Sequence, residues 1–169
     1  MRIYLNIFLF SQSMETEEDL LKKHQENPKD TKTIYDLAVF YTKTENYEQA
    51  KKYFESLVSI EPNLFDAYNG LGFALQRQEK WIDAIKTYQK GLKLDTPKTV
   101  IKDSYLKLKI GSYKNIAACH LKINEPQHTI ACYKIIMKLD PSLSKEMEGK
   151  IEAITKLRSL NEGSQPVLY

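Results

Sequence analysis

The amino-acid sequence repeats an ordered pattern of large, small and turn-forming residues at an interval of 34 positions. Residues of matching size stand that far apart in a first and a second copy: Ile34/Tyr68, Leu37/Leu71, Ala38/Gly72, Ala50/Ala84, Phe54/Tyr88. A third copy keeps the order after an insertion: Tyr113, Ile116, Ala117, Thr129, Tyr133. A fixed period of a few tens of residues indicates an array of small units, each of which needs its neighbours to bury its apolar face.

Each copy contains two stretches in which apolar residues recur at intervals of three and four, the spacing of an amphipathic helix. In the first copy these stretches include Leu37 and Tyr41, then Ala50 and Phe54, with the polar turn Lys43–Asn46 between them. Small residues at the same place in each copy let two helix backbones cross closely. Prolines follow the second stretch, where they cannot continue a helix. The sequence therefore predicts repeated helix–turn–helix pairs.

The second copy, FDAYNGLGFALQRQEKWIDAIKTYQKGLKLDTP, resembles the tetratricopeptide repeat. The resemblance implies an all-α, right-handed solenoid of three helix pairs with capping helices at both ends. We expect an apolar segment 1–13, a capping helix 14–30, repeats 31–64, 65–98 and 110–143, a helix-extending insertion 99–109, a cap 144–160 and a tail 161–169. The third copy is also similar to the C-terminal tetratricopeptide segments of immunophilins, and the second copy is similar to bacterial secretion chaperones.

The charge is nearly balanced, with 25 basic and 22 acidic residues and a net charge of +3. Such a balance does not favour nucleic acid as a partner. Cys119 and Cys132 are interpreted as small core residues rather than a disulfide framework. We therefore expect a reducing, intracellular compartment, with the cytoplasm favoured over mitochondrial and ciliary alternatives.

No arrangement of residues indicates catalysis, a cofactor or a metal ion. His120 occupies an aromatic position of the third copy and is interpreted as a core residue, while His24 lies in the N-terminal helix and His128 near the start of a later one. No Cys/His spacing matches a zinc site. Gly70 and Gly72 lie within an expected helix, so they do not form a phosphate loop. We expect a non-catalytic protein.

The first helix of each unit is expected to line a concave groove, as in other solenoids of this kind. Residues on these helices that are not needed for packing are the candidate partner-binding residues: Tyr35, Val39, Asn69, Phe73, Arg77, Lys114, Asn115, Ala118, Leu121 and Lys122. Their side chains predict an apolar floor with a basic side. Packing between neighbouring units is the alternative role for each aromatic residue among them.

The expected function is binding of a peptide or partner subunit along this groove, as a subunit of a larger assembly. The apolar run within Ile3–Phe10 supports the assembly, because it would be an exposed apolar patch on a monomer. Folding back of this segment into the protein's own groove is the alternative to burial against a partner. A chaperone-like adaptor for one client protein is an alternative, and RNA binding by the lysine-rich third unit is an alternative of another class. The positions that grip the C-terminal carboxylate of heat-shock chaperones in related domains hold Tyr35, Val39, Gly70, Gly111 and Asn115, which argues against that partner.

Overall fold

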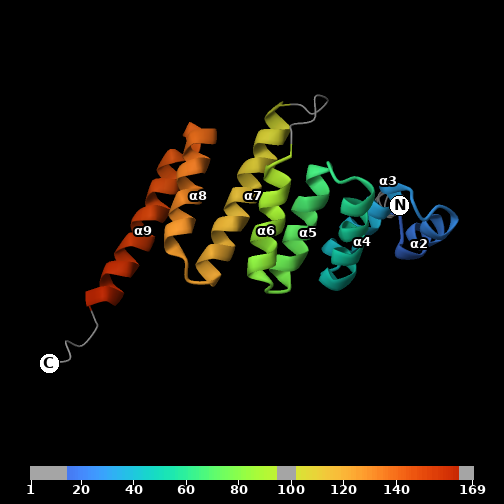
Figure 1. Cartoon of the computed structure of the whole chain (residues 1–169), viewed down its shortest axis with the longest axis horizontal. Coiled ribbons are helices and arrows are strands. Elements are labelled where there is room, and N and C mark those ends of the chain that lie inside the picture. The colour runs from blue at the N-terminus through green and yellow to red at the C-terminus, as the bar shows by residue number, and fades with distance from the viewer. Residues whose placement is uncertain (1–14, 95–101, 164–169) are drawn as a thin grey trace, which may run out of the picture.

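The computed structural model describes residues 15–94 and 102–163, and the part it describes is entirely helical. The α-helices are α2 (Glu17–Glu26), α3 (Thr31–Lys43), α4 (Tyr47–Ile60), α5 (Phe65–Arg77), α6 (Trp81–Leu92), α7 (Lys102–Lys122), α8 (Pro126–Leu139) and α9 (Ser144–Gly163). They lie side by side in chain order along the long axis of the molecule (Figure 1). The expected all-α helical-repeat fold is confirmed. The apolar segment 1–13, Pro97 and residues 99–101 lie outside the described residues.

Local sequence determines where several of these helices begin. Thr16 and Asp19 form a reciprocal capping box at the start of α2, and Asp30 accepts a hydrogen bond from the Thr33 backbone N–H (3.0 Å) at the start of α3. Each turn within a helix pair contains one residue in the left-handed conformation, namely Glu45, Glu79 or Asn124, with φ of 59°, 60° and 59°. The same turn therefore recurs in all three pairs, α3/α4, α5/α6 and α7/α8.

The predicted core positions are buried. Ile34, Leu37 and Ala38 of α3 are fully excluded from solvent, as are Ala50 and Leu57 of α4. Ala84 and Ala117 are also fully buried, so small residues do lie where helices cross. Cys119 and Cys132 are buried and unpaired, which confirms their interpretation as core residues.

Two glycines of α5 pack directly against aromatic rings of neighbouring helices. A Cβ atom added at Gly72 would lie 2.8 Å from the Tyr88 ring of α6, within the same pair. A Cβ atom added at Gly70 would lie 2.2 Å from the Phe54 ring of α4, which belongs to the preceding pair. One glycine thus permits packing within a unit and the other permits packing between units. Gly70 is therefore a packing position, whereas its place on the first helix suggested a free groove position.

Helix α7 is 21 residues long, whereas α3 and α5 have 13 each. Its added turns pack onto the preceding unit: the Tyr105 ring meets the Phe65 ring edge-on at a centroid distance of 5.4 Å. The Tyr105 hydroxyl also donates a hydrogen bond to the Leu94 carbonyl oxygen (3.4 Å). The extension therefore contacts both the start of α5 and the chain directly after the end of α6.

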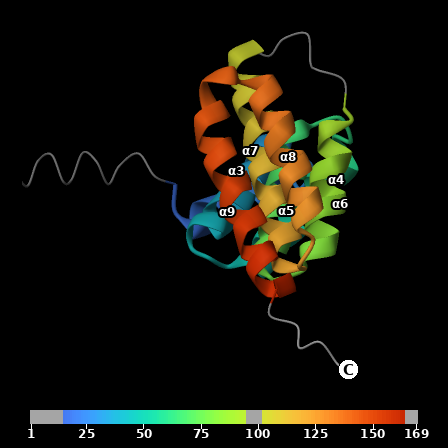
Figure 2. The ribbon, with the colours of Figure 1, turned by 90° about the vertical axis from the view of Figure 1, so that its left-hand side faces the viewer.

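Helix α9 covers the last repeat with only part of its apolar stripe. Met147 is fully buried, and Ile151 and Ile154 pack against the core. Leu157 continues this stripe by helical spacing, but it is 63% exposed, and Leu160 is 61% exposed. The helix continues to Gly163, past the expected end at 160, and projects beyond α8 (Figure 1), so its last turns have no helix to cover. Figure 2 shows α8 and α9 in front of the earlier pairs when the stack is seen from this end.

None of the described helices combines the length and the apolar character needed to cross a bilayer.

Candidate partner-binding site

The first helices of the three pairs form one continuous row. Cα atoms of α3 approach those of α5 within 8 Å, and α5 approaches α7 in the same way. Among the described residues, no such approach joins α4 to α6 or α6 to α8. Because the first helices lie closer together than the second helices, the stack curves toward the α3–α5–α7 row. The residues that this row exposes are the candidate partner-binding site.

Four of the predicted groove residues keep apolar surface on this row. The side chains of Tyr35, Ala118 and Leu121 are exposed, and Val39 is half-buried. Tyr35 is held by an edge-on contact with the Phe54 ring, at a centroid distance of 6.4 Å. Val39 and Ala118 occupy the same register on α3 and α7. The row therefore exposes apolar side chains at both of its ends.

Three other predicted groove residues, Phe73, Arg77 and Lys122, lie where consecutive units meet. We call this region the inter-unit seam, and it also contains their partners Tyr47 and Trp81. The Phe73 ring meets the Tyr47 ring edge-on at 6.2 Å, and the Arg77 guanidinium lies 5.1 Å from the centre of the same Tyr47 ring. The Lys122 ammonium lies 5.9 Å from the centre of the Trp81 ring in the next seam.

These seam contacts repeat with the architecture. Tyr47 and Trp81 are both the first residue of a second helix, and Arg77 and Lys122 both stand at the last position of the following first helix. A cation over an aromatic face is stabilised by the ring quadrupole. The side chains of Phe73, Arg77 and Lys122 thus have structural contacts between units. The sequence pattern indicates this role as an alternative for the aromatic Phe73 but not for Arg77 or Lys122.

Polar groove residues make contacts between helices. The Ser112 hydroxyl of α7 donates a hydrogen bond to Asn69 Oδ1 of α5 (3.1 Å). Asn115 lies beside the Tyr88 hydroxyl, which donates to Gln76 Oε1 (3.0 Å). Lys114 lies close enough to Glu146 of α9 that its positive charge helps the Lys150 contact to lower the pKa of that carboxyl. These residues line the row and hold it together.

The N-terminal half of the row is acidic rather than basic. Burial raises the pKa of the Tyr35 hydroxyl, and the negative charges of Asp66 and Asp36 raise it further. Burial likewise raises the pKa of the Asp66 carboxyl. Two carboxylates therefore flank Tyr35 where α3 meets α5, while Lys114 and Lys122 lie on α7. The predicted basic side consists of Arg77 at the end of α5 and of Lys114 and Lys122 on α7, whereas the charged groups beside Tyr35 are acidic.

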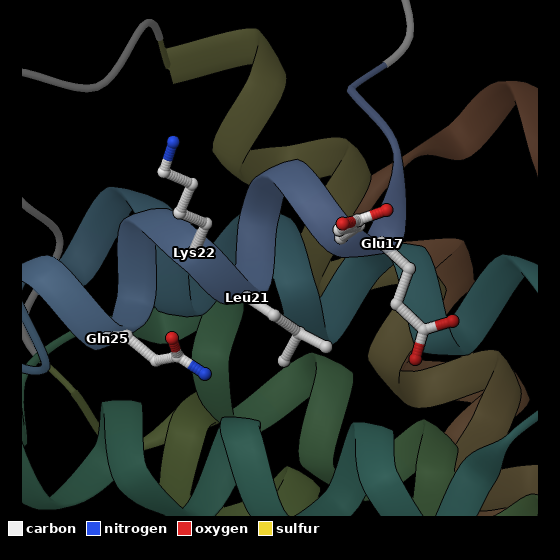
Figure 3. Close-up of a pocket in the computed structure, with 5 residues that line it drawn as sticks. Glu17, Leu21, Lys22 and Gln25 are labelled. Atoms are coloured by element: carbon white, nitrogen blue, oxygen red, sulfur yellow. The ribbon is translucent and has the colours of Figure 1, made fainter.

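Apart from the α3–α5–α7 row, the surface has a hollow on α2, at the N-terminal end of the described chain (Figure 3). The described residues that line it come from this one helix: Glu17, Glu18, Leu21, Lys22 and Gln25. In Figure 3, Lys22 and Gln25 point away from each other, and Leu21 points toward the neighbouring helices. One helix face cannot enclose a ligand, so this hollow does not add a binding site from the described residues.

The turn between α7 and α8 brings together three residues that the sequence did not predict to meet. His120 Nδ1 lies 2.7 Å from Glu125 Oε2, and His128 Nδ1 lies 3.5 Å from the same oxygen. His120 is buried, as expected for a core position, but its ring stacks on that of His128 at a centroid distance of 4.8 Å. The spacing places the three positions around one turn, but the packing of α7 against α8 decides that their side chains meet.

The buried thiols make stability depend on pH. Burial raises the pKa of both Cys119 and Cys132 to about 11. Because each folded-state pKa lies above the unfolded value, the associated stability is fully present below about pH 8.5 and is lost as pH rises toward 11. Urea unfolding at a series of pH values should show this decline. In the double variant Cys119→Ala/Cys132→Ala the decline should be shallower, and an unchanged slope would contradict the assignment.

Comparison with known proteins agrees with this architecture. A tetratricopeptide-repeat family model matches residues 31–64. The small glutamine-rich tetratricopeptide repeat-containing protein 2 of Saccharomyces cerevisiae is 37% identical over 67 residues, 38% of this chain. The chain spans only 19% of the length of that curated relative.

Solved structures share the fold at low sequence identity. The type III secretion chaperone SycD of Yersinia enterocolitica, in complex with a peptide of the translocator YopD, has a TM-score of 0.63 at 21% identity, covering 75% of this chain and 93% of that one. MamA has a TM-score of 0.70 at 16% identity, covering 86% and 78%. The first such domain of human RPAP3 has a TM-score of 0.62 at 16% identity, covering 82% and 100%.

The stacked helix pairs and their recurring turn define a helical-repeat solenoid. One of its units, residues 31–64, matches the tetratricopeptide-repeat family model, and the fold of the chain is that of tetratricopeptide-repeat structures. This fold is in general a scaffold for interaction rather than catalysis, and its function resides in the surface it presents.

Proposed function

We propose that this protein binds a peptide segment of a partner protein along the α3–α5–α7 row. The observation that carries the proposal is the set of apolar side chains that stacking leaves uncovered there, Tyr35, Val39, Ala118 and Leu121. Extended concave surfaces of this kind are how helical-repeat proteins bind partners. SycD, whose fold is similar, is known in complex with a peptide of its translocator, which supports the same use here.

The charges on the row define the chemistry of the peptide. Asp36 and Asp66 flank Tyr35 at one end, so this end suits basic peptide residues. Lys114 and Lys122 lie toward the other end, which suits acidic ones. The peptide we propose therefore has apolar residues between a basic and an acidic segment. A bare C-terminal carboxylate does not fit the position of Gly70, because the Phe54 ring covers it.

Substitution of Ala118 by glutamate tests the groove without disturbing the fold, because this side chain is exposed. A peptide-display library is selected on the immobilised full-length protein, and the affinity of the recovered peptide is measured. We expect Ala118→Glu to weaken its binding about tenfold or more, because a carboxylate would replace an apolar contact and would compete for Lys114 and Lys122 with the acidic segment of the peptide. Phe73→Glu is a poorer test, because it would also break the contact with Tyr47.

The matched control is Ala131→Glu, which makes the same change at an exposed position of α8, outside the row. It should leave the peptide affinity unchanged. Equal losses in the two variants would contradict the proposed surface, as would full retention of binding by Ala118→Glu.

Co-purification of the native protein distinguishes two roles for peptide binding, that of an assembly subunit and that of a chaperone-like adaptor. A structural subunit of an assembly should co-purify with its partners at fixed stoichiometry and remain with them after extended washing. A chaperone-like adaptor should instead be recovered with a substoichiometric client. The subunit role is the one we propose.

RNA binding is the alternative of another class, and Lys107, Lys109 and Lys114 of α7 favour it. Phosphate contacts release counterions, so affinity for RNA would fall steeply as salt is raised. Peptide binding through an apolar row should depend on salt only weakly. Steeply salt-sensitive RNA binding with no peptide recovered would replace the proposed function.

A further inference from the structure

We propose that His120, Glu125 and His128 form a binding site for a divalent transition-metal ion such as Zn²⁺. One ligand atom from each residue lies within 4.8 Å of the other two. The two histidine Nδ1 atoms converge on a single carboxylate oxygen, Glu125 Oε2, at 2.7 and 3.5 Å. Two imidazoles with one carboxylate are a donor set that suits Zn²⁺, Ni²⁺ or Cu²⁺, whereas Mg²⁺ and Ca²⁺ prefer oxygen ligands alone.

Binding of one ion requires the His128 ring to turn, because the two imidazole rings are stacked with 17° between their planes and a metal bonds in the plane of each ring. Zinc bonds to nitrogen and oxygen are about 2.0–2.2 Å long, so tetrahedral ligand atoms lie roughly 3.3–3.5 Å apart. The distance from His128 Nδ1 to Glu125 Oε2, 3.5 Å, already lies in that range, whereas the 2.7 Å distance from His120 Nδ1 must lengthen. The widest separation, up to 4.8 Å, is the one that must close. His128 can move to close it, because its side chain is 66% exposed at the start of α8.

Only the third unit carries these donors. The equivalent positions of the earlier units hold other side chains: Tyr41, Asn46 and Gln49, then Leu75, Lys80 and Asp83. Asn46 Oδ1 caps its helix by accepting from the Gln49 backbone N–H (3.3 Å). Glu125 occupies the same N-cap position but makes no cap hydrogen bond with its side chain, which is directed at the histidines. The third unit is thus the one of the three that has potential metal ligands at all three positions.

The site is open to solvent on one side. A hollow of about 410 Å³ lies between α6, α7 and α8, and both His120 and His128 line it. An ion can therefore reach the imidazoles and retain water as a further ligand. Bound there, it would link the C-terminal end of α7 to the N-terminal end of α8 across the turn. The third helix pair should consequently become more resistant to unfolding.

The test uses full-length protein that carries no affinity tag and has been stripped of metal with a chelator. Titration with ZnCl₂, followed by calorimetry, should show one saturable site per chain. CoCl₂ should give the visible d–d absorption of a tetrahedral ion, and CaCl₂ and MgCl₂ should give no binding. His128→Ala and Glu125→Gln should each weaken Zn²⁺ binding about tenfold or more. Both side chains are exposed or half-exposed, so far-UV circular dichroism should show unchanged helicity.

Two further variants assign the ligands. His24→Ala removes a histidine of α2 that packs on Tyr53 and should leave the Zn²⁺ affinity unchanged. Cys132 lines the hollow that also contains His120 and His128. Cys132→Ser therefore tests whether a thiolate binds the ion instead, and it should also leave the Zn²⁺ affinity unchanged. Absence of saturable binding, survival of binding in His128→Ala, or its loss in Cys132→Ser would each overturn the proposal.

Discussion

Replacing Phe54 by alanine is expected to lower the free energy of unfolding by about 3–5 kcal/mol. The Phe54 side chain is 3% exposed and its ring covers Gly70 of the next unit, where an added Cβ atom would come within 2.2 Å. It also meets the Tyr35 ring edge-on. Alanine would leave a cavity between the first and second units, and the solenoid depends on contacts between neighbouring units for its stability. Guanidinium unfolding followed by circular dichroism measures the loss.

Ile60→Ala is the control for this prediction, because it lies on the same helix and is 39% exposed. It should change the free energy of unfolding by no more than about 0.5 kcal/mol. If Phe54→Ala were no more destabilising than Ile60→Ala, the contact between the Phe54 ring and Gly70 would not be a stabilising element of the stack.

Replacing Ala84 by tryptophan is expected to lower the free energy of unfolding by roughly 1–3 kcal/mol or more. Ala84 is fully buried on α6, facing the crossing with α5. Gly72 of α5 already receives the Tyr88 ring in this crossing, at 2.8 Å from an added Cβ atom, so no free volume remains for an indole ring. The two helices would have to separate, and the apolar contacts around them would be lost.

Ile82→Trp introduces the same side chain at a 57% exposed position of α6 and should have little effect on the melting temperature. A melting temperature for Ala84→Trp equal to that of the unsubstituted protein would show that the helix crossing is elsewhere.

The fold and most of the core could be predicted from the sequence. Helical spacing and a fixed period depend on residues close together in the chain, so the order of large and small residues already defines each helix pair. Leu37, Ala50 and Ala84 are buried as this pattern requires. Pro126 begins α8, where its missing N–H removes no helical hydrogen bond.

The candidate site could be predicted only in outline. The sequence placed the candidate residues on the first helices but did not separate those that face a partner from those that join two units. Arg77 and Lys122 lie over rings of the preceding unit, and Asp66 lies beside Tyr35 of another helix. These contacts depend on how far one unit is rotated and shifted against the next, and that offset has no local signal.

The sequence by itself determined the helix pairs, their turns and the small residues at each crossing, because these follow from periodicity and local conformational preference. Tertiary structure alone decided three other features: the contacts between units, the acidic surroundings of Tyr35 and the meeting of His120, Glu125 and His128. Their side chains come from different helices or from opposite sides of a turn. Whether such groups touch is set by the packing of complete helices against each other, which is the sum of many contacts along the chain.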